Sequence, residues 1–115
     1  MSDRDYTDYI KDIINSIDEI EEFTANMSFQ SFVEDRKTVN AIIRSLEVLG
    51  EAAKKIPEEI RKKHPDVPWK RMAGMRDKLI HEYSGVDLEI IWKTIKEDVP
   101  SLEHSIKKML KNLER

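Results

Sequence analysis

The stretch from Val39 to Ile56 constrains the fold most, because its apolar side chains recur at steps of three or four residues. This spacing places them on one face of an α-helix and leaves the opposite face polar. A helix with one apolar face is stable only when that face packs against other apolar elements. The apolar members are Val39, Ile42, Ile43, Leu46, Leu49, Ala53 and Ile56.

The rest of the chain supplies partners with the same periodicity. No segment alternates between apolar and polar residues as a strand does, and the connections are short. We therefore predict an all-α fold: a single domain, 1–115, built as one antiparallel bundle of about five helices. Phe29, Phe32 and Val33 are expected in a short apolar turn, and Val99-Pro100 is expected to interrupt the chain's last helical region. The other predicted helices cover 4–23, 58–63, 68–83, a segment from Leu88 capped by Asp87, and 102–113.

Length, net charge and cysteine content exclude several classes of function. The chain has 115 residues, a net charge of −3 and no cysteine. A general polyanion binder is excluded because no overall positive field exists, so a nucleic acid would need a local site. The absence of cysteine excludes disulfides and thiol catalysis, and together with the polar start and the lack of a long apolar run it predicts a cytoplasmic protein with no membrane contact.

The predicted helix after Pro68 has two unlike faces. Its core face carries Met72, Met75, Leu79 and Tyr83, whereas Arg76, Asp77 and His81 lie on another face with the small residues Ala73 and Gly74. Small residues allow another backbone to approach, and the polar trio would be costly to bury without partners. This face is expected to form a cleft against a second helix, either of the same chain or of another subunit.

A second polar stripe runs along the helix from Val39 to Ile56, opposite its apolar face. It contains Asn40, Arg44, Glu47 and Glu51. Two interpretations remain open at this point. The stripe is either a solvated face with weak ion pairs within the helix, or a polar ridge in which Asn40, Arg44 and Glu47 support the same cleft.

Arg76 and His81 together suffice for RNA cleavage without a metal or other cofactor. Histidine both accepts and gives a proton near neutral pH, and the planar guanidinium of arginine matches phosphate oxygens. No His or Cys pair has metal-ligand spacing, and no serine lies in a glycine-rich elbow. By pattern alone, however, an Arg and a His five residues apart on a helix are commonplace, so binding or purely structural roles stay open.

Three blocks of the sequence carry a family resemblance. The segment 76–83 resembles the R-x4-H-x-Y form of the HEPN ribonuclease motif found in HepT-like toxins. The segments 40–53 and 68–75 resemble that family's middle helix and the lead-in to its motif. The resemblance covers nearly the whole chain, in the same order.

This resemblance implies a homodimeric ribonuclease toxin of a type VII toxin–antitoxin pair. Arg76 and His81 would be catalytic, Asp77 would support them, and the hydroxyl of Tyr83 would accept AMP. The implied partners are an RNA substrate and a minimal nucleotidyltransferase antitoxin (MntA-like), which uses ATP to modify the tyrosine and so blocks the site, within an assembly that is a dimer or larger. The alternative is a non-catalytic helical dimer that binds the nucleotidyltransferase or a nucleotide.

Overall fold

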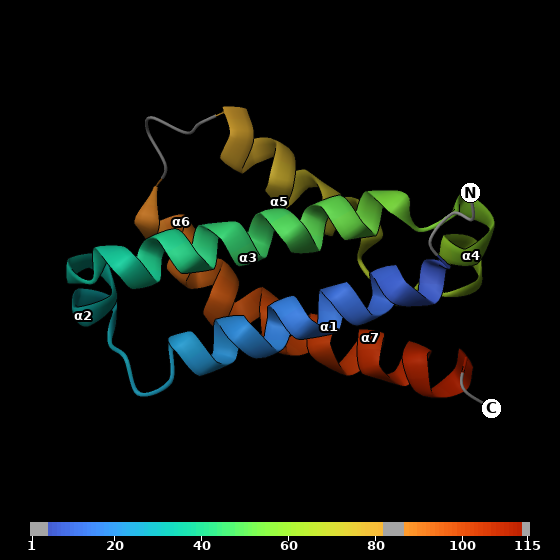
Figure 1. The fold of residues 1–115 in the computed structure, drawn as a ribbon, viewed down its shortest axis with the longest axis horizontal. Helices are drawn as coiled ribbons and strands as arrows, with labels where there is room; N and C mark the ends of the chain where they lie inside the picture. The colour runs from blue at the N-terminus through green and yellow to red at the C-terminus, as the bar shows by residue number, and fades with distance from the viewer. Residues whose placement is uncertain (1–4, 82–86, 114–115) are drawn as a thin grey trace.

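The computed structural model describes residues 5–81 and 87–113, with side chains described for 5–76 and 87–113. Within these ranges every regular element is helical, which confirms the predicted all-α fold (Figure 1). The elements are α1 (Tyr6–Phe23), α2 (Phe29–Glu34), α3 (Arg36–Lys55), α4 (Glu58–Lys63), α5 (Trp69–His81), α6 (Leu88–Lys93), a π-helical segment (Thr94–Asp98) and α7 (Val99–Leu113).

Short polar side chains begin several of these helices. Asp5 accepts a hydrogen bond from the amide of Thr7 at the start of α1, and Asp87 accepts one from the amide of Glu89 at the start of α6. The predicted cap at Asp87 is thus confirmed. Asp35 caps α3 by accepting from the amide and hydroxyl of Thr38. These bonds satisfy amides that have no partner within their own helix.

Two local expectations were wrong. The apolar turn around Phe32 is a short helix, α2, because Ser28 and Ser31 close a capping box at its start. Val99-Pro100 does not interrupt the helix, since α6 continues through the π-helical segment into α7. Proline lacks an N–H and suits a first helical turn, and the wider π-helical turn bonds residues five apart, so the helix accommodates Pro100.

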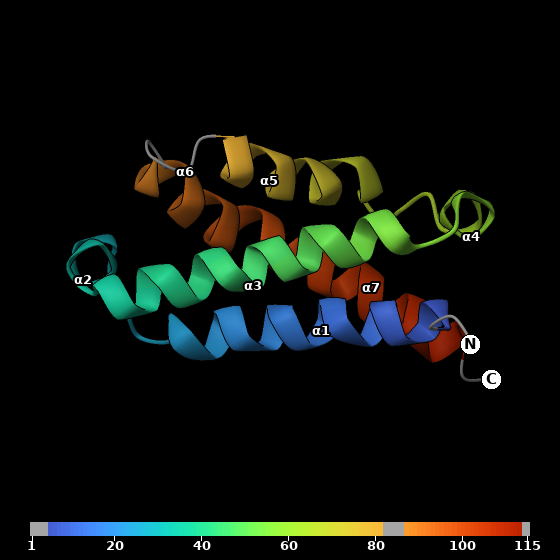
Figure 2. The same ribbon diagram turned by 45° about the horizontal axis from the view of Figure 1, so that its top comes forward.

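Helix α3 is the centre of the bundle. It packs between α1 and α5, and α7 lies against α1 (Figure 2). Successive long helices run in opposite directions, as expected for an antiparallel bundle (Figure 1). One core cluster joins α1, α3, α5 and α7 through residues such as Ile13, Leu49, Met72 and Ile106. The other joins α2, α3 and α6, so both ends of α3 are anchored.

None of the described helices combines the length and the apolar character needed to cross a membrane.

Candidate functional site

Helix α5 presents Arg76 to α3. The start of α5 is fixed by Trp69, whose indole N–H donates to the carbonyl of His64 at 3.0 Å, and by Met72, which is fully buried. Arg76 lies four residues after Met72 and therefore near the same face of the helix. The packing that buries Met72 thus also sets the position of Arg76.

The closest approach of α3 and α5 occurs at Gly50. A Cβ atom added at this glycine would lie 2.5 Å from Cβ of Arg76 and 2.9 Å from the carbonyl oxygen of Met72. Neither atom belongs to a flexible side-chain end, so no larger residue fits without moving the helices apart. The small residue that permits the close approach of α3 and α5 is therefore Gly50 of α3. Among the described residues, a Cβ at Gly74 would meet no atom within 4 Å.

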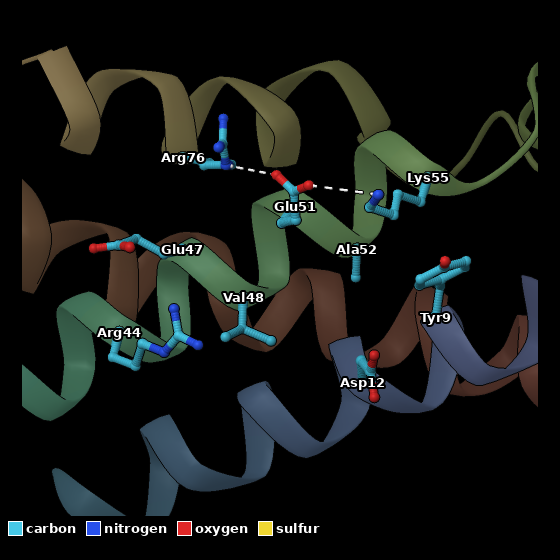
Figure 3. A pocket seen from close by; sticks show the side chains of 9 residues that line it. All are labelled: Tyr9, Asp12, Arg44, Glu47, Val48, Glu51, Ala52, Lys55 and Arg76. Atoms are coloured by element: carbon cyan, nitrogen blue, oxygen red, sulfur yellow. Dashed lines mark ion pairs between the residues drawn. The ribbon is translucent and has the colours of Figure 1, made fainter. Parts of the chain in front are cut away.

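The next residue of α3 binds the arginine. Nε of Arg76 lies 2.6 Å from Oε2 of Glu51, and Nζ of Lys55 lies 3.8 Å from the other oxygen of the same carboxylate (Figure 3). The side chains of Arg76 and Glu51 are 30% and 45% exposed. Both charges therefore reach water while remaining paired.

A pocket of about 260 Å³ opens beside this ion pair. Its walls come from α1, α3 and α5, with Val48 and Ala52 of α3 as the apolar part (Figure 3). Arg44 and Glu47 line the pocket together with Arg76, so the structure brings these three predicted residues to one place. Asn40 is exposed and does not line it. The described residues that line the pocket are Tyr9, Asp12, Arg44, Glu47, Val48, Glu51, Ala52, Lys55 and Arg76.

Three further predicted residues lie at or beyond the end of what is described. Asp77 and His81 belong to the backbone of α5, and their side chains are outside the described set. Tyr83 is outside the described residues altogether. Because His81 is five residues after Arg76 on one helix, their backbones are separated by roughly 7.5 Å along the helix axis.

Sequence reasoning missed several contributors to the site. Glu51 was recognised as part of the polar stripe but not as the partner of Arg76, because one helix's periodicity does not reveal its register against another. Gly50 carried a usable signal, since a glycine inside a helical pattern suggests close backbone approach. For Tyr9 and Asp12 of α1, the sequence contained no such signal.

A second cluster of charges joins α1 to α7. Carboxylate oxygens of Asp18, Glu21 and Glu103 lie within 4.8 Å of one another, and Lys107 pairs with Glu103 at 3.0 Å and with Asp18 at 3.6 Å. A hydrogen bond between Glu21 and Glu103 raises the pKa of Glu21 and lowers the pKa of Glu103. The hydrogen bond to Glu103 likewise raises the pKa of Lys107. Lys107 and the hydrogen bond between Glu21 and Glu103 therefore offset part of the negative charge of this cluster.

The site at α3 and α5 differs, because there a permanent cation is fixed beside an open pocket. A guanidinium in such a place can bind a phosphate group or stabilise negative charge that develops during a reaction. The surrounding mixture of Tyr9, apolar side chains and further charges suits a ligand with both a ring and anionic groups.

Comparison with known proteins gives the family. Residues 13–109 match the family described as Ribonuclease HepT-like. A protein of Thermococcus cleftensis named "Probable ribonuclease HepT" is 51% identical over 94% of this chain and 98% of its own length. Two relatives whose names class them provisionally as RNases come from Methanocaldococcus jannaschii (44% identical, 99% of this chain and 94% of the relative) and Caldanaerobacter subterraneus (48%, 89% and 91%). No solved structure matches. The extent of these matches shows that the chain belongs to the HepT-like ribonuclease family.

Proposed function

We propose that this protein is an endoribonuclease that cleaves RNA without a metal ion, using Arg76 and His81. The observation that carries the proposal is the placement of Arg76, which is held by Glu51 at the edge of a pocket between α1, α3 and α5. Membership of a ribonuclease family supports the choice of RNA as the substrate.

In the proposed reaction, the ribose 2′-oxygen attacks the adjacent phosphorus. A bond forms between the 2′-oxygen and phosphorus, and the bond from phosphorus to the 5′-oxygen breaks. His81 either accepts the proton of the 2′-hydroxyl while water protonates the leaving 5′-oxygen, or gives its proton to that oxygen while water accepts the proton of the 2′-hydroxyl. Arg76 stabilises the negative charge on the phosphoryl oxygens. Asp77 supports this pair by orienting one of them. The products are a 2′,3′-cyclic phosphate and a 5′-hydroxyl, and DNA is not cut because it lacks the attacking group.

The test uses purified protein, labelled RNA and a metal chelator. We expect cleavage by the unchanged protein and its loss in both Arg76→Ala and His81→Ala, with helical content and melting temperature retained. RNA binding without cleavage by the unchanged protein would instead favour a binding module. Undiminished cleavage by His81→Ala would contradict the mechanism.

We further propose that the protein is the toxin of a type VII toxin–antitoxin pair and acts as a homodimer or within a larger complex. Its partner is a minimal nucleotidyltransferase that transfers AMP from ATP to Tyr83. The tyrosine oxygen attacks the α-phosphate, pyrophosphate leaves, and the phenolic proton is released. The support is the R-x4-H-x-Y spacing of Arg76, His81 and Tyr83. The added phosphate would stand two residues from His81 and block the site by charge and bulk.

Mass spectrometry tests this regulation. Incubation with the nucleotidyltransferase and ATP is expected to add one or more AMP masses to the unchanged chain and none to Tyr83→Phe. The modified protein should no longer cleave RNA. AMP addition to Tyr83→Phe would move the acceptor to another residue.

A further inference from the structure

We propose that Glu51 is a positioning residue, which orients the guanidinium of Arg76 toward the scissile phosphate. The inference rests on the proposed function, because it assigns Glu51 a task in the same reaction. Three observations carry it: the atom of Arg76 that Glu51 binds, the packing that fixes both backbones, and the small part this pair can have in stability.

Glu51 binds the arginine at Nε. This nitrogen carries one of the five N–H groups of the guanidinium, and the other four belong to the two terminal nitrogens. The Nε–Oε2 distance is 2.6 Å, and the rest of the guanidinium extends away from Glu51 (Figure 3). Because the guanidinium is planar, a short bond at Nε restricts its rotation and thereby sets the direction of the terminal nitrogens. Terminal nitrogens are the atoms that reach farthest toward a phosphate.

The two backbones that carry this pair are fixed relative to each other. Gly50 precedes Glu51 and lies against Cβ of Arg76 and the carbonyl of Met72. Lys55, one turn later on α3, contacts the second oxygen of Glu51 at 3.8 Å. The carboxylate therefore lies between two cations, on a helix whose backbone packs closely against α5 at Gly50. Such restraint is what a positioning group needs, because a misplacement of about 1 Å can slow a reaction about 100-fold.

Stability alone does not account for the pair. Both side chains are partly exposed, at 30% and 45%, and an exposed ion pair contributes little to the free energy of unfolding. A change that barely affects folding but strongly affects the reaction is therefore the signature to look for.

The kinetic experiment compares Glu51→Leu, Glu51→Gln and the unchanged chain on labelled RNA. We expect Glu51→Leu to lower kcat roughly 10- to 100-fold with little change in KM, because the lost orientation matters most in the transition state. Glu51→Gln should be intermediate, since its amide oxygen still accepts a hydrogen bond from Nε. Glu58→Leu is the matched control, because Glu58 forms an exposed ion pair with Lys62 on α4 and is not among the described residues that line the pocket. It should leave kcat unchanged.

An NMR measurement examines the contact without relying on activity. The Nε–H proton of Arg76, assigned by its absence in Arg76→Lys, should exchange slowly with water in the unchanged protein. In Glu51→Leu it should exchange at least ten times faster, and in Glu58→Leu it should not change.

The outcomes separate the two proposals. If Arg76→Ala still cleaves RNA, the proposed function fails. If Arg76→Ala is inactive while Glu51→Leu keeps its kcat or gains activity, only the positioning role fails, and a gain would mean that Glu51 holds Arg76 away from the substrate. An effect confined to KM would also overturn positioning, because it would indicate ground-state binding.

Discussion

Two helix contacts in this protein carry charged clusters that differ in construction. At the α3–α5 contact, Glu51 pairs with Arg76 at 2.6 Å beside the pocket, and Gly50 allows the backbones to touch. At the α1–α7 contact, Glu103 pairs with Lys107 at 3.0 Å, and Glu21 shares a hydrogen bond with Glu103. Of these two contacts, only the first has a glycine that brings the helix backbone close to the residue that carries the cation.

The difference teaches that charge clustering by itself does not mark a functional site. Lys107 has a flexible side chain and pairs with two of the three carboxylates around it. Its ammonium group therefore offers no fixed geometry to a ligand. A guanidinium held at Nε by Glu51, next to a glycine contact and a pocket, offers a fixed direction and space for a substrate.

The largest effect is expected from Arg76→Lys. Arginine can bind Glu51 through Nε and a phosphate through its terminal nitrogens at the same time. Lysine keeps the positive charge but has a single ammonium group and cannot make both contacts with the same geometry. By analogy with the loss of one transition-state hydrogen bond, the cleavage rate should fall about 100-fold or more. The measurement is the rate of RNA cleavage under single-turnover conditions.

The counterpart at the other contact is Lys107→Ala, which should cleave RNA at the unchanged rate. If Lys107→Ala lowered the cleavage rate as much as Arg76→Lys, the α1–α7 contact would matter for the reaction as much as the α3–α5 contact, which would contradict the comparison.

Gly50→Ala should have the second largest effect. The added methyl group would overlap Cβ of Arg76 and approach the Met72 carbonyl, so α3 and α5 must separate. Overpacking of this kind costs about 1–3 kcal/mol of unfolding free energy. Urea denaturation followed by circular dichroism measures the change.

Gly74→Ala is the matched control on α5. Its Cβ would meet no described atom within 4 Å, and alanine favours a helix over glycine, so stability should rise by about 0.5–1 kcal/mol. A loss of stability at Gly74 as large as that at Gly50 would contradict the assignment of Gly50 as the contact.

The smallest effect is expected at the α1–α7 contact and depends on pH. The pKa of Glu21 is raised above its ordinary value of 4.5. Its contribution to the free energy of unfolding is therefore fully present below pH 4.5 and is lost as the pH rises through the pKa of the folded state. The pKa of Glu103 is lowered from the same ordinary value. Its contribution to the free energy of unfolding is therefore fully present above pH 4.5 and is lost as the pH falls through the pKa of the folded state. The shared hydrogen bond should therefore stabilise the fold most near pH 4.5.

Glu21→Gln tests this sign. Glutamine donates to Glu103 without needing a proton from solution, so the variant should be slightly more stable than the unchanged chain at pH 7, by at most about 0.5 kcal/mol. The gain should disappear near pH 4.5. Thermal unfolding at both values measures it, and a gain that is larger at pH 4.5 than at pH 7 would reverse the assignment.

Much of the fold could be predicted from the sequence, because helix formation and helix ends depend on nearby residues. The bounds of α4 and the cap at Asp87 are confirmed as predicted. The continuation from α6 to α7 was not predicted, because whether a proline ends a helix or begins its first turn depends on packing beyond the local sequence.

The candidate site was only half predictable, for a related reason. Helical spacing placed Arg76 on a polar face and grouped Glu51 with Arg44 and Glu47, and those residues do line one pocket. The spacing could not match Glu51 with Arg76, because that pairing depends on how α3 and α5 slide along each other. The close approach at Gly50 marks that register. This register can be recognised only when the positions of both helices are known.

The most direct test of the account is cleavage of an RNA that contains a single 2′-deoxynucleotide at the mapped cleavage position, in the presence of a chelator. Without the 2′-hydroxyl, attack on the adjacent phosphorus is impossible. The account predicts that this one position is no longer cut, while an all-ribose control yields a 2′,3′-cyclic phosphate end. Cleavage that continues at the deoxy position would contradict the proposed use of Arg76 and His81.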